Sequence, residues 1–175
     1  MTLPYPEIFI PDAQNTLGQM YAYAVHIRKY NIDKFQKLFI ESGDADAFAA
    51  GNIELIAGMS GMELAHHVLW SLHIPTEELE IGCKISRNSN EYRAGAIVAY
   101  FQRHTGRSFQ NIHSYFPMSR FVEFAKMYYG MSDDEIFEKI TYEICRIVYH
   151  NDPNFLELLE KDNKPVSSTG TKLLM

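Results

Sequence analysis

The 175-residue sequence predicts an all-α fold: a compact orthogonal bundle of about six to eight helices with an extended N-terminal arm. Three observations lead to this prediction. Apolar residues recur three and four positions apart in several segments, and Ser-x-x-Glu sequences typical of helix starts precede two of these segments. No pair of alternating apolar segments joined by a hairpin turn occurs. The 46% hydrophobic and 22% charged content is that of an ordinary globular domain.

Residues 90–106 form the helix around which the other elements are predicted to pack. A glycine inside a helix costs about 1 kcal/mol relative to alanine, unless close packing offsets the cost. We therefore predict that another backbone approaches this helix at Gly95. The apolar residues at helical spacing form one face that must be covered by other elements. These residues are Ala94, Ile97, Val98 and Phe101.

The same kinds of sequence signal predict the secondary structure of the segments before this helix. Residues 1–12 contain three prolines around an apolar patch, which predicts the extended arm. A first amphipathic helix is expected over residues 13–30, and a second over 33–43 with Asp33 and Gln36 in a capping arrangement.

A short helical turn is expected over residues 46–50, followed by a connector over residues 51–61 that Ile53, Leu55 and Ile56 attach to the core. Ser60 and Glu63 form a capping box that starts a third strong helix, over residues 61–73. The conformation of residues 76–89 stays open. Later helices are expected over residues 108–116, 119–130, 132–150 and 153–161.

Length and composition favour a single helical domain over residues 1–161 and a flexible polar tail over 162–175. The net charge of −6 argues against direct nucleic-acid binding, which needs a dominant basic face. Cys83 and Cys145 belong to no CxxC pair, and no signal-peptide pattern occurs, so we expect reduced cysteines and a cytoplasmic location. No apolar run approaches the roughly 20 residues needed to cross a membrane.

The candidate binding site is a ridge of arginine and tyrosine side chains on the side of the 90–106 helix opposite its apolar face. Guanidinium groups bind carboxylates and phosphates in two-point fashion, so the ridge is predicted to dock a small anionic ligand or an acidic protein partner. The alternative is that the arginines pair with Glu77, Glu78 and Glu80 of the preceding loop. The ridge comprises Arg93, Tyr100 and Arg103, with Arg107 just beyond the helix end.

A second candidate site has the Glu-x-x-His spacing of one half of a carboxylate-bridged di-metal centre. Its residues are Glu63, His66 and His67, and they define the alternative function of a metal-dependent hydrolase. The sequence offers no second Glu-x-x-His, and Glu63 is also the capping partner of Ser60. No catalytic residue and no cofactor are therefore expected.

Two stretches carry a resemblance to a known family. They are residues 57–65 and residues 91–109, the second containing Thr105, Gly106, Arg107, Ser108 and Phe109 in succession. They resemble a family of uncharacterised bacterial all-helical domains that is often followed by a phage-repressor-type helix-turn-helix. The resemblance covers roughly residues 33–130, and no such module is expected after Glu160.

The resemblance implies a regulatory or partner-binding role related to toxin-antitoxin or defence systems, without DNA reading. Three positions depart from the family pattern: Arg93 and Ile97 replace bulky aromatics, and His104 replaces a tyrosine. The leading hypothesis is thus a non-enzymatic helical module that binds a protein or a small anion. Homodimerisation through aromatics such as Tyr128 and Tyr129 is a further hypothesis.

Overall fold

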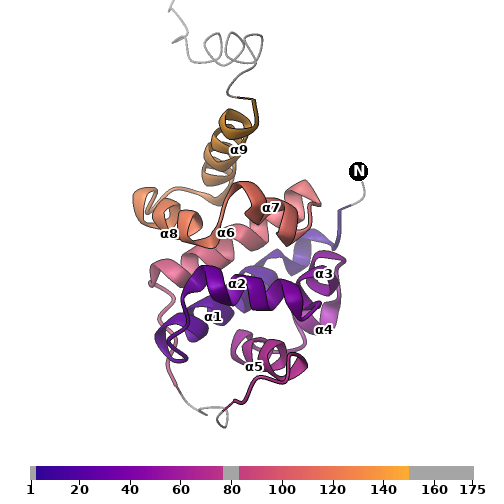
Figure 1. Cartoon of the computed structure of the whole chain (residues 1–175). Coiled ribbons are helices and arrows are strands. Elements are labelled where there is room, and N and C mark those ends of the chain that lie inside the picture. The colour runs from indigo at the N-terminus through magenta and orange to yellow at the C-terminus, as the bar shows by residue number, and fades with distance from the viewer. Residues whose placement is uncertain (1–2, 77–82, 150–175) are drawn as a thin grey trace, which may run out of the picture.

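The computed structural model describes residues 3–76 and 83–149, and every regular element in these ranges is a helix (Figure 1). The predicted all-α helical bundle is therefore confirmed. In chain order, the elements are η1 (Glu7–Phe9), α1 (Ile10–His26), α2 (Ile32–Glu41), α3 (Asp44–Ala49), α4 (Ile53–Ile56), α5 (Gly61–Ser71), α6 (Asn90–Thr105), α7 (Phe109–Tyr115), α8 (Met118–Met127) and α9 (Asp133–Tyr149).

Helix α6 packs closely against α1. A Cβ atom at Gly95 would lie 2.4 Å from the carbonyl oxygen of Leu17 and 2.8 Å from the Cα atom of Gly18. Only glycine permits this approach, because real Cβ contacts below 3.0 Å essentially do not occur. The predicted backbone contact at Gly95 is confirmed, and all four residues of the predicted apolar face of α6 are buried.

The other side of α1 packs against α5 in the same manner. A Cβ atom at Gly61 would lie 2.1 Å from the carbonyl oxygen of Thr16. The Thr16 hydroxyl donates a hydrogen bond to the carbonyl of Ile56 (2.9 Å), which ties α4 to the same helix. As Figure 1 shows, α1 thus lies between α5 and α6.

Several predicted helix ends are confirmed. The capping box of Ser60 and Glu63 is present at the start of α5, and Ser132 and Glu135 exchange the equivalent hydrogen bonds at the start of α9. Gly106 ends α6 in the left-handed conformation.

Other boundaries differ from the prediction. The N-terminal arm is shorter than expected because α1 begins at Ile10, with Pro11 in the first turn where its missing N–H is tolerated. Asn31, not Asp33, caps α2, and it accepts from the Lys34 amide at 3.1 Å. The Asp33 carboxylate instead accepts a hydrogen bond from the Ser119 amide (2.9 Å), which links α2 to α8.

The connector after α3 contains the short helix α4, which the sequence pattern did not predict. The predicted helix over residues 153–161, the tail over 162–175 and part of the open segment 76–89 lie outside the described residues. None of the described helices combines the length and apolar character required to cross a membrane.

Candidate functional site

Helix α6 is enclosed on most sides, which corrects the prediction that its arginine-bearing side is exposed. Arg103 is only 7% exposed, and Phe101 and Gln102 beside it are also buried. The physical reason is that α1, α8 and α9 all pack on this helix, so Arg103 is buried while Arg93 and Tyr100 are half-buried. Arg93, Tyr100, Arg103 and Arg107 therefore do not form one surface ridge.

Arg103 is a buried side chain near the end of α6. Its Nη1 atom donates to Nε2 of His104 (3.3 Å), and Nδ1 of His104 donates to the carbonyl of Tyr100 (2.9 Å). These two bonds together require a neutral imidazole with its proton on Nδ1. The Nε atom of Arg103 is buried and has no hydrogen-bond partner among the described residues. Burial raises the pKa of Tyr5, and the nearby Arg103 charge opposes that shift.

Tyr100 links α9 to α6 through a hydrogen bond and ring contacts. Its hydroxyl donates to the carboxylate of Asp134, and its ring lies 4.0 Å from the ring of His104. Burial and the hydrogen bond to Asp134 raise the pKa of Tyr100 to about 12, so the hydroxyl keeps its proton at neutral pH. Phe137 of α9 packs against both rings. The middle of the predicted ridge is thus covered by the first turns of α9.

The two remaining arginines have different surroundings. Arg93 donates to the carbonyl of Ala125, and its guanidinium lies 4.3 Å from the ring centre of Tyr129, a cation–π arrangement. Arg107 is exposed and donates to the side-chain oxygen of Asn111 (3.3 Å). Neither arginine forms an ion pair with a carboxylate in the described part of the chain. The predicted partners Glu77, Glu78 and Glu80 lie outside that part.

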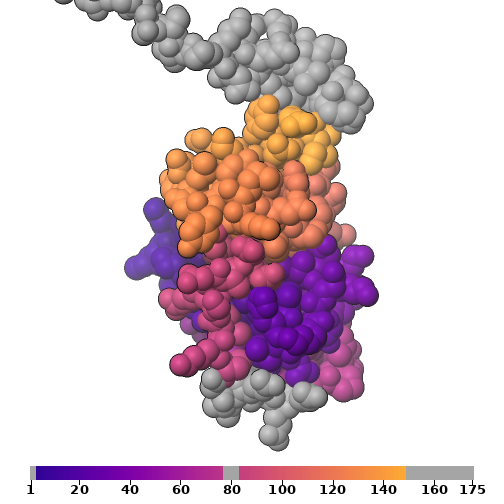
Figure 2. Space-filling view, turned by 90° about the vertical axis from the view of Figure 1, so that its left-hand side faces the viewer, coloured from indigo at the N-terminus to yellow at the C-terminus, as the bar shows by residue number. Residues whose placement is uncertain are grey.

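A groove crosses α6 near its start, between α1 and the turn that leads into α9; we call it the α6 groove. It consists of two adjoining hollows of about 480 and 160 Å³ that share Tyr92 and Ala96. The larger is also lined by Pro11, Asp12, Gln14, Asn15 and Arg87, and the smaller by Arg93, Ile97, Met131, Asp133 and Ile136. In Figure 2, pink residues around the start of α6 reach the surface beside indigo N-terminal residues and below the orange α8–α9 region.

Two hydrogen bonds hold the sides of the α6 groove together. The Tyr92 hydroxyl donates to the side-chain oxygen of Asn15 (2.8 Å), and the Gln14 amide donates to Asp133 (2.8 Å). Burial raises the pKa of Tyr92, and the positive charge of nearby Arg87 opposes this shift. The groove is therefore built by α1, α6 and α9 together and is fixed by polar contacts between them.

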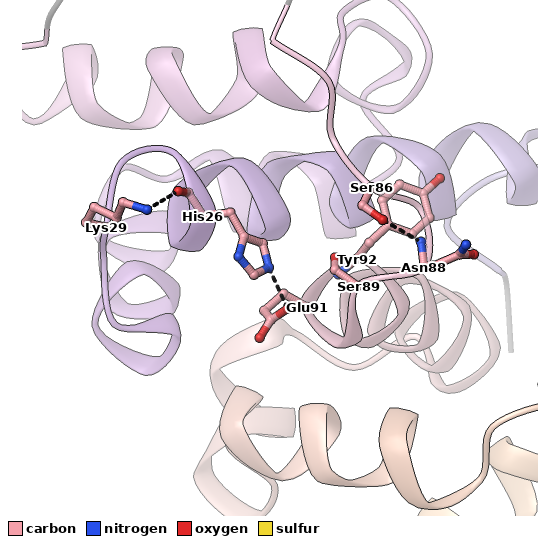
Figure 3. A network of polar contacts seen from close by, with 7 residues as sticks. All are labelled: His26, Lys29, Ser86, Asn88, Ser89, Glu91 and Tyr92. Carbon is pink, nitrogen blue, oxygen red and sulfur yellow. Dashed lines mark hydrogen bonds and ion pairs between the residues drawn. The ribbon is translucent and has the colours of Figure 1, made fainter.

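A polar network at the start of α6 supports the same region (Figure 3). Nε2 of His26 lies 2.7 Å from the carboxylate of Glu91, which joins the end of α1 to the start of α6. Lys29 donates to the carbonyl of His26 (2.6 Å), and the Ser89 hydroxyl caps α6 by accepting from the Tyr92 amide (3.2 Å). Sequence reasoning missed the contact between His26 and Glu91, since residues so far apart in the chain give no local signal.

The residues of the alternative metal site have separate partners. Glu63 accepts from the Ser60 amide (2.7 Å), His66 is hydrogen bonded to the Tyr23 hydroxyl (2.7 Å), and His67 donates to Asp44 (2.9 Å). The hydrogen bonds from Ser60 lower the pKa of Glu63, as expected for a helix cap. Within residues 3–76 and 83–149, no three His, Cys, Asp or Glu side chains are arranged to hold a metal ion. The structure therefore does not assemble the predicted alternative site.

The aromatic residues proposed for homodimerisation also differ from each other. Tyr129 is 71% exposed, whereas Tyr128 is half-buried and packs against Phe124. Comparisons of the chain with protein-family models, curated proteins and solved structures give no match. The geometry of the α6 groove is therefore the basis for a functional proposal.

Proposed function

We propose that this protein is a non-enzymatic helical module that binds a protein partner in the α6 groove. The groove itself supports the proposal, because it combines arginine, tyrosine and methionine side chains at one accessible place. These residue types are enriched in protein interfaces, where arginine and aromatic side chains commonly supply most of the binding energy. Tyr129 (71% exposed) and Met131 (40% exposed) beside Arg93 provide such side chains.

The shape of the groove favours a protein segment over a small anionic ligand. Small-molecule sites are usually enclosed and bury most of the ligand surface. Here two hollows lie open at the surface, and Tyr92 and Ala96 line both of them. A protein segment laid across the start of α6 fills both hollows at once, while a single small anion fills only one.

The family resemblance of residues 57–65 and 91–109 adds a biological context to this proposal. Members of the family that these stretches resemble are often followed by a repressor-type module, which favours a regulatory partner in a toxin-antitoxin or defence setting. The α6 groove lies within the second of these stretches, since Tyr92, Arg93 and Ala96 all line it.

The experiment is a selection of random 12-residue peptides displayed on phage, with the full-length protein as the immobilised target. Ala96→Trp places an indole where the two hollows meet and should abolish binding of the selected peptides. Ala47→Trp, at a half-buried position on α3, is the matched control and should leave binding unchanged. Circular dichroism and melting temperature verify that both variants fold. Equal binding to Ala96→Trp and the wild type would place the binding surface elsewhere and refute the proposal.

A further inference from the structure

We infer that the segment bound in the α6 groove is acidic, with one carboxylate in each hollow, bound to Arg87 in the larger and Arg93 in the smaller. This inference rests on the proposed function and specifies the partner's chemistry. Arg87 lines the larger hollow and Arg93 the smaller, so the two cationic groups are distributed along the length of the groove.

Both arginines lack an anionic partner in the described part of the chain. The sequence has 22 acidic against 16 basic residues, so a guanidinium in this protein has many carboxylates available. Arg120 and Arg146, by contrast, each pair with a glutamate on the same helix. Among residues 3–76 and 83–149, Arg87 forms no ion pair, and the guanidinium of Arg93 donates to a carbonyl oxygen and lies over an aromatic ring. Their capacity for two-point binding of a carboxylate is therefore unused.

Two carboxylates of the chain also face the groove, and their charges are partly compensated. Asp12 lies in the first turn of α1, and Asp133 in the first turn of α9. The N-terminus of a helix carries about half a positive elementary charge, which stabilises an aspartate at this position. Asp133 also accepts a hydrogen bond from Gln14. Arg87 and Arg93 formally balance these two aspartates, and the two helix N-termini add positive partial charge beside the groove.

The floor between the arginines determines what lies between the two carboxylates of the partner. Ala96 is small, and Ile97 and Ile136 contribute apolar surface beneath it. An apolar side chain of the partner fits over Ala96 and covers this surface. The expected ligand is a short segment with an acidic, an apolar and a second acidic residue in that order.

The test uses the peptides selected on the wild-type protein as probes. The most enriched peptide is synthesised with a fluorescein label, together with a copy in which Asp and Glu are replaced by Asn and Gln. Fluorescence anisotropy should show at least tenfold weaker binding of the amide copy to the wild type. The double variant Arg87→Gln/Arg93→Gln should bind the acidic peptide at least tenfold more weakly. The control Arg120→Gln, which removes a charge of equal sign from α8, should bind it as the wild type does.

The outcomes separate this inference from the proposed function. One outcome is that Ala96→Trp abolishes binding, but the selected peptides contain no excess of acidic residues or bind the arginine double variant normally. This outcome would overturn the acidic partner and leave the groove as the binding site. If the selected peptides bind Ala96→Trp as well as the wild type, or if the selection enriches no peptide, both the acidic partner and the groove as the binding site would be overturned. Weaker binding of the acidic peptide at higher salt, with no such change for the amide copy, would support the inference further.

Discussion

The imidazole of His113 is held without charge between α7 and α8. Its Nδ1 atom donates to the carbonyl of Phe116 (2.9 Å), while Nε2 is buried and has no hydrogen-bond partner in the part of the chain that the structure describes. The rings of Phe109 and Phe121 pack on it. Burial lowers the pKa of His113 from 6.5 to about 4, so the folded protein resists protonation of this side chain.

This shift predicts acid sensitivity of the folded state. Between pH 6.5 and 4 the unfolded chain binds a proton at His113 that the folded protein excludes, so stability falls as the pH falls. The free energy of unfolding, measured by urea denaturation, should decrease by about 2 to 3 kcal/mol between pH 7 and 4.5 from this group alone. Because His66 and the carboxylates also contribute, the comparison is with His113→Gln, which should lose less stability over the same range. Parallel pH profiles of the two proteins would contradict the prediction.

The arginines show at the same scale what a helical pattern can and cannot predict. Position on a helix placed Arg93 and Arg103 on one side of α6, opposite the apolar face. The pattern carries no information on how many other helices pack around α6. Arg103 is buried because its neighbours include Tyr5, which is distant in the chain, whereas Arg93 borders the groove. The sequence therefore predicted that arginine lines the site, but it could not predict which of the two arginines is buried.

At the scale of elements, the crossing of α1 and α6 depends on the absence of a side chain at Gly95. In a helix without tertiary contacts, Gly→Ala stabilises by about 1 kcal/mol. Here the added methyl group would lie 2.4 Å from the carbonyl of Leu17, so the two helices must separate. We predict that Gly95→Ala lowers the free energy of unfolding by about 2 to 4 kcal/mol, measured by urea denaturation. Ala96→Gly, one position further, should cost only the propensity term of about 1 kcal/mol. A stabilised Gly95→Ala protein would show that the crossing is looser than described.

Helix ends were predictable to the extent that their signals are local. The capping boxes of α5 and α9 are complete within four residues, and both are present. The start of α1 was misplaced because proline in the first turn of a helix and proline in an extended arm give the same sequence signal. Helix α4 spans only Ile53–Ile56, too short to produce a periodic apolar pattern.

At the scale of the whole molecule, the α6 groove exists because three distant segments meet. Residues 11–15, 87–97 and 131–136 line it, and the hydrogen bonds from Gln14 to Asp133 and from Tyr92 to Asn15 hold them together. Each segment alone has the sequence pattern of an ordinary amphipathic helix or turn. Sequence reasoning predicted Arg93 as a binding residue, but the groove depends on long-range packing that no local pattern encodes.

Helix α9 forms one side of the groove and is the least embedded of the long helices. Figure 1 shows it rising away from the bundle, and Ile147 and Val148 near its end are 46% and 40% exposed. Its buried residues are Ile136, Ile140 and Ile144, and Tyr100 binds Asp134 in its first turn. Local opening is easiest where few apolar contacts hold a helix, so α9 should open more readily than α1.

Hydrogen–deuterium exchange measures this difference directly. Amides of residues 136–145 should exchange faster than those of residues 16–24 in α1. Tyr100→Phe removes the hydrogen bond to Asp134, worth about 1 kcal/mol, so exchange in α9 should accelerate about fivefold while α1 stays unchanged. Tyr142→Phe, which alters an exposed tyrosine of α9 itself, is the matched control and should have no effect. If α9 proves as protected as α1, or responds equally to both substitutions, then α9 does not open separately and Tyr100 is not its main attachment to α6.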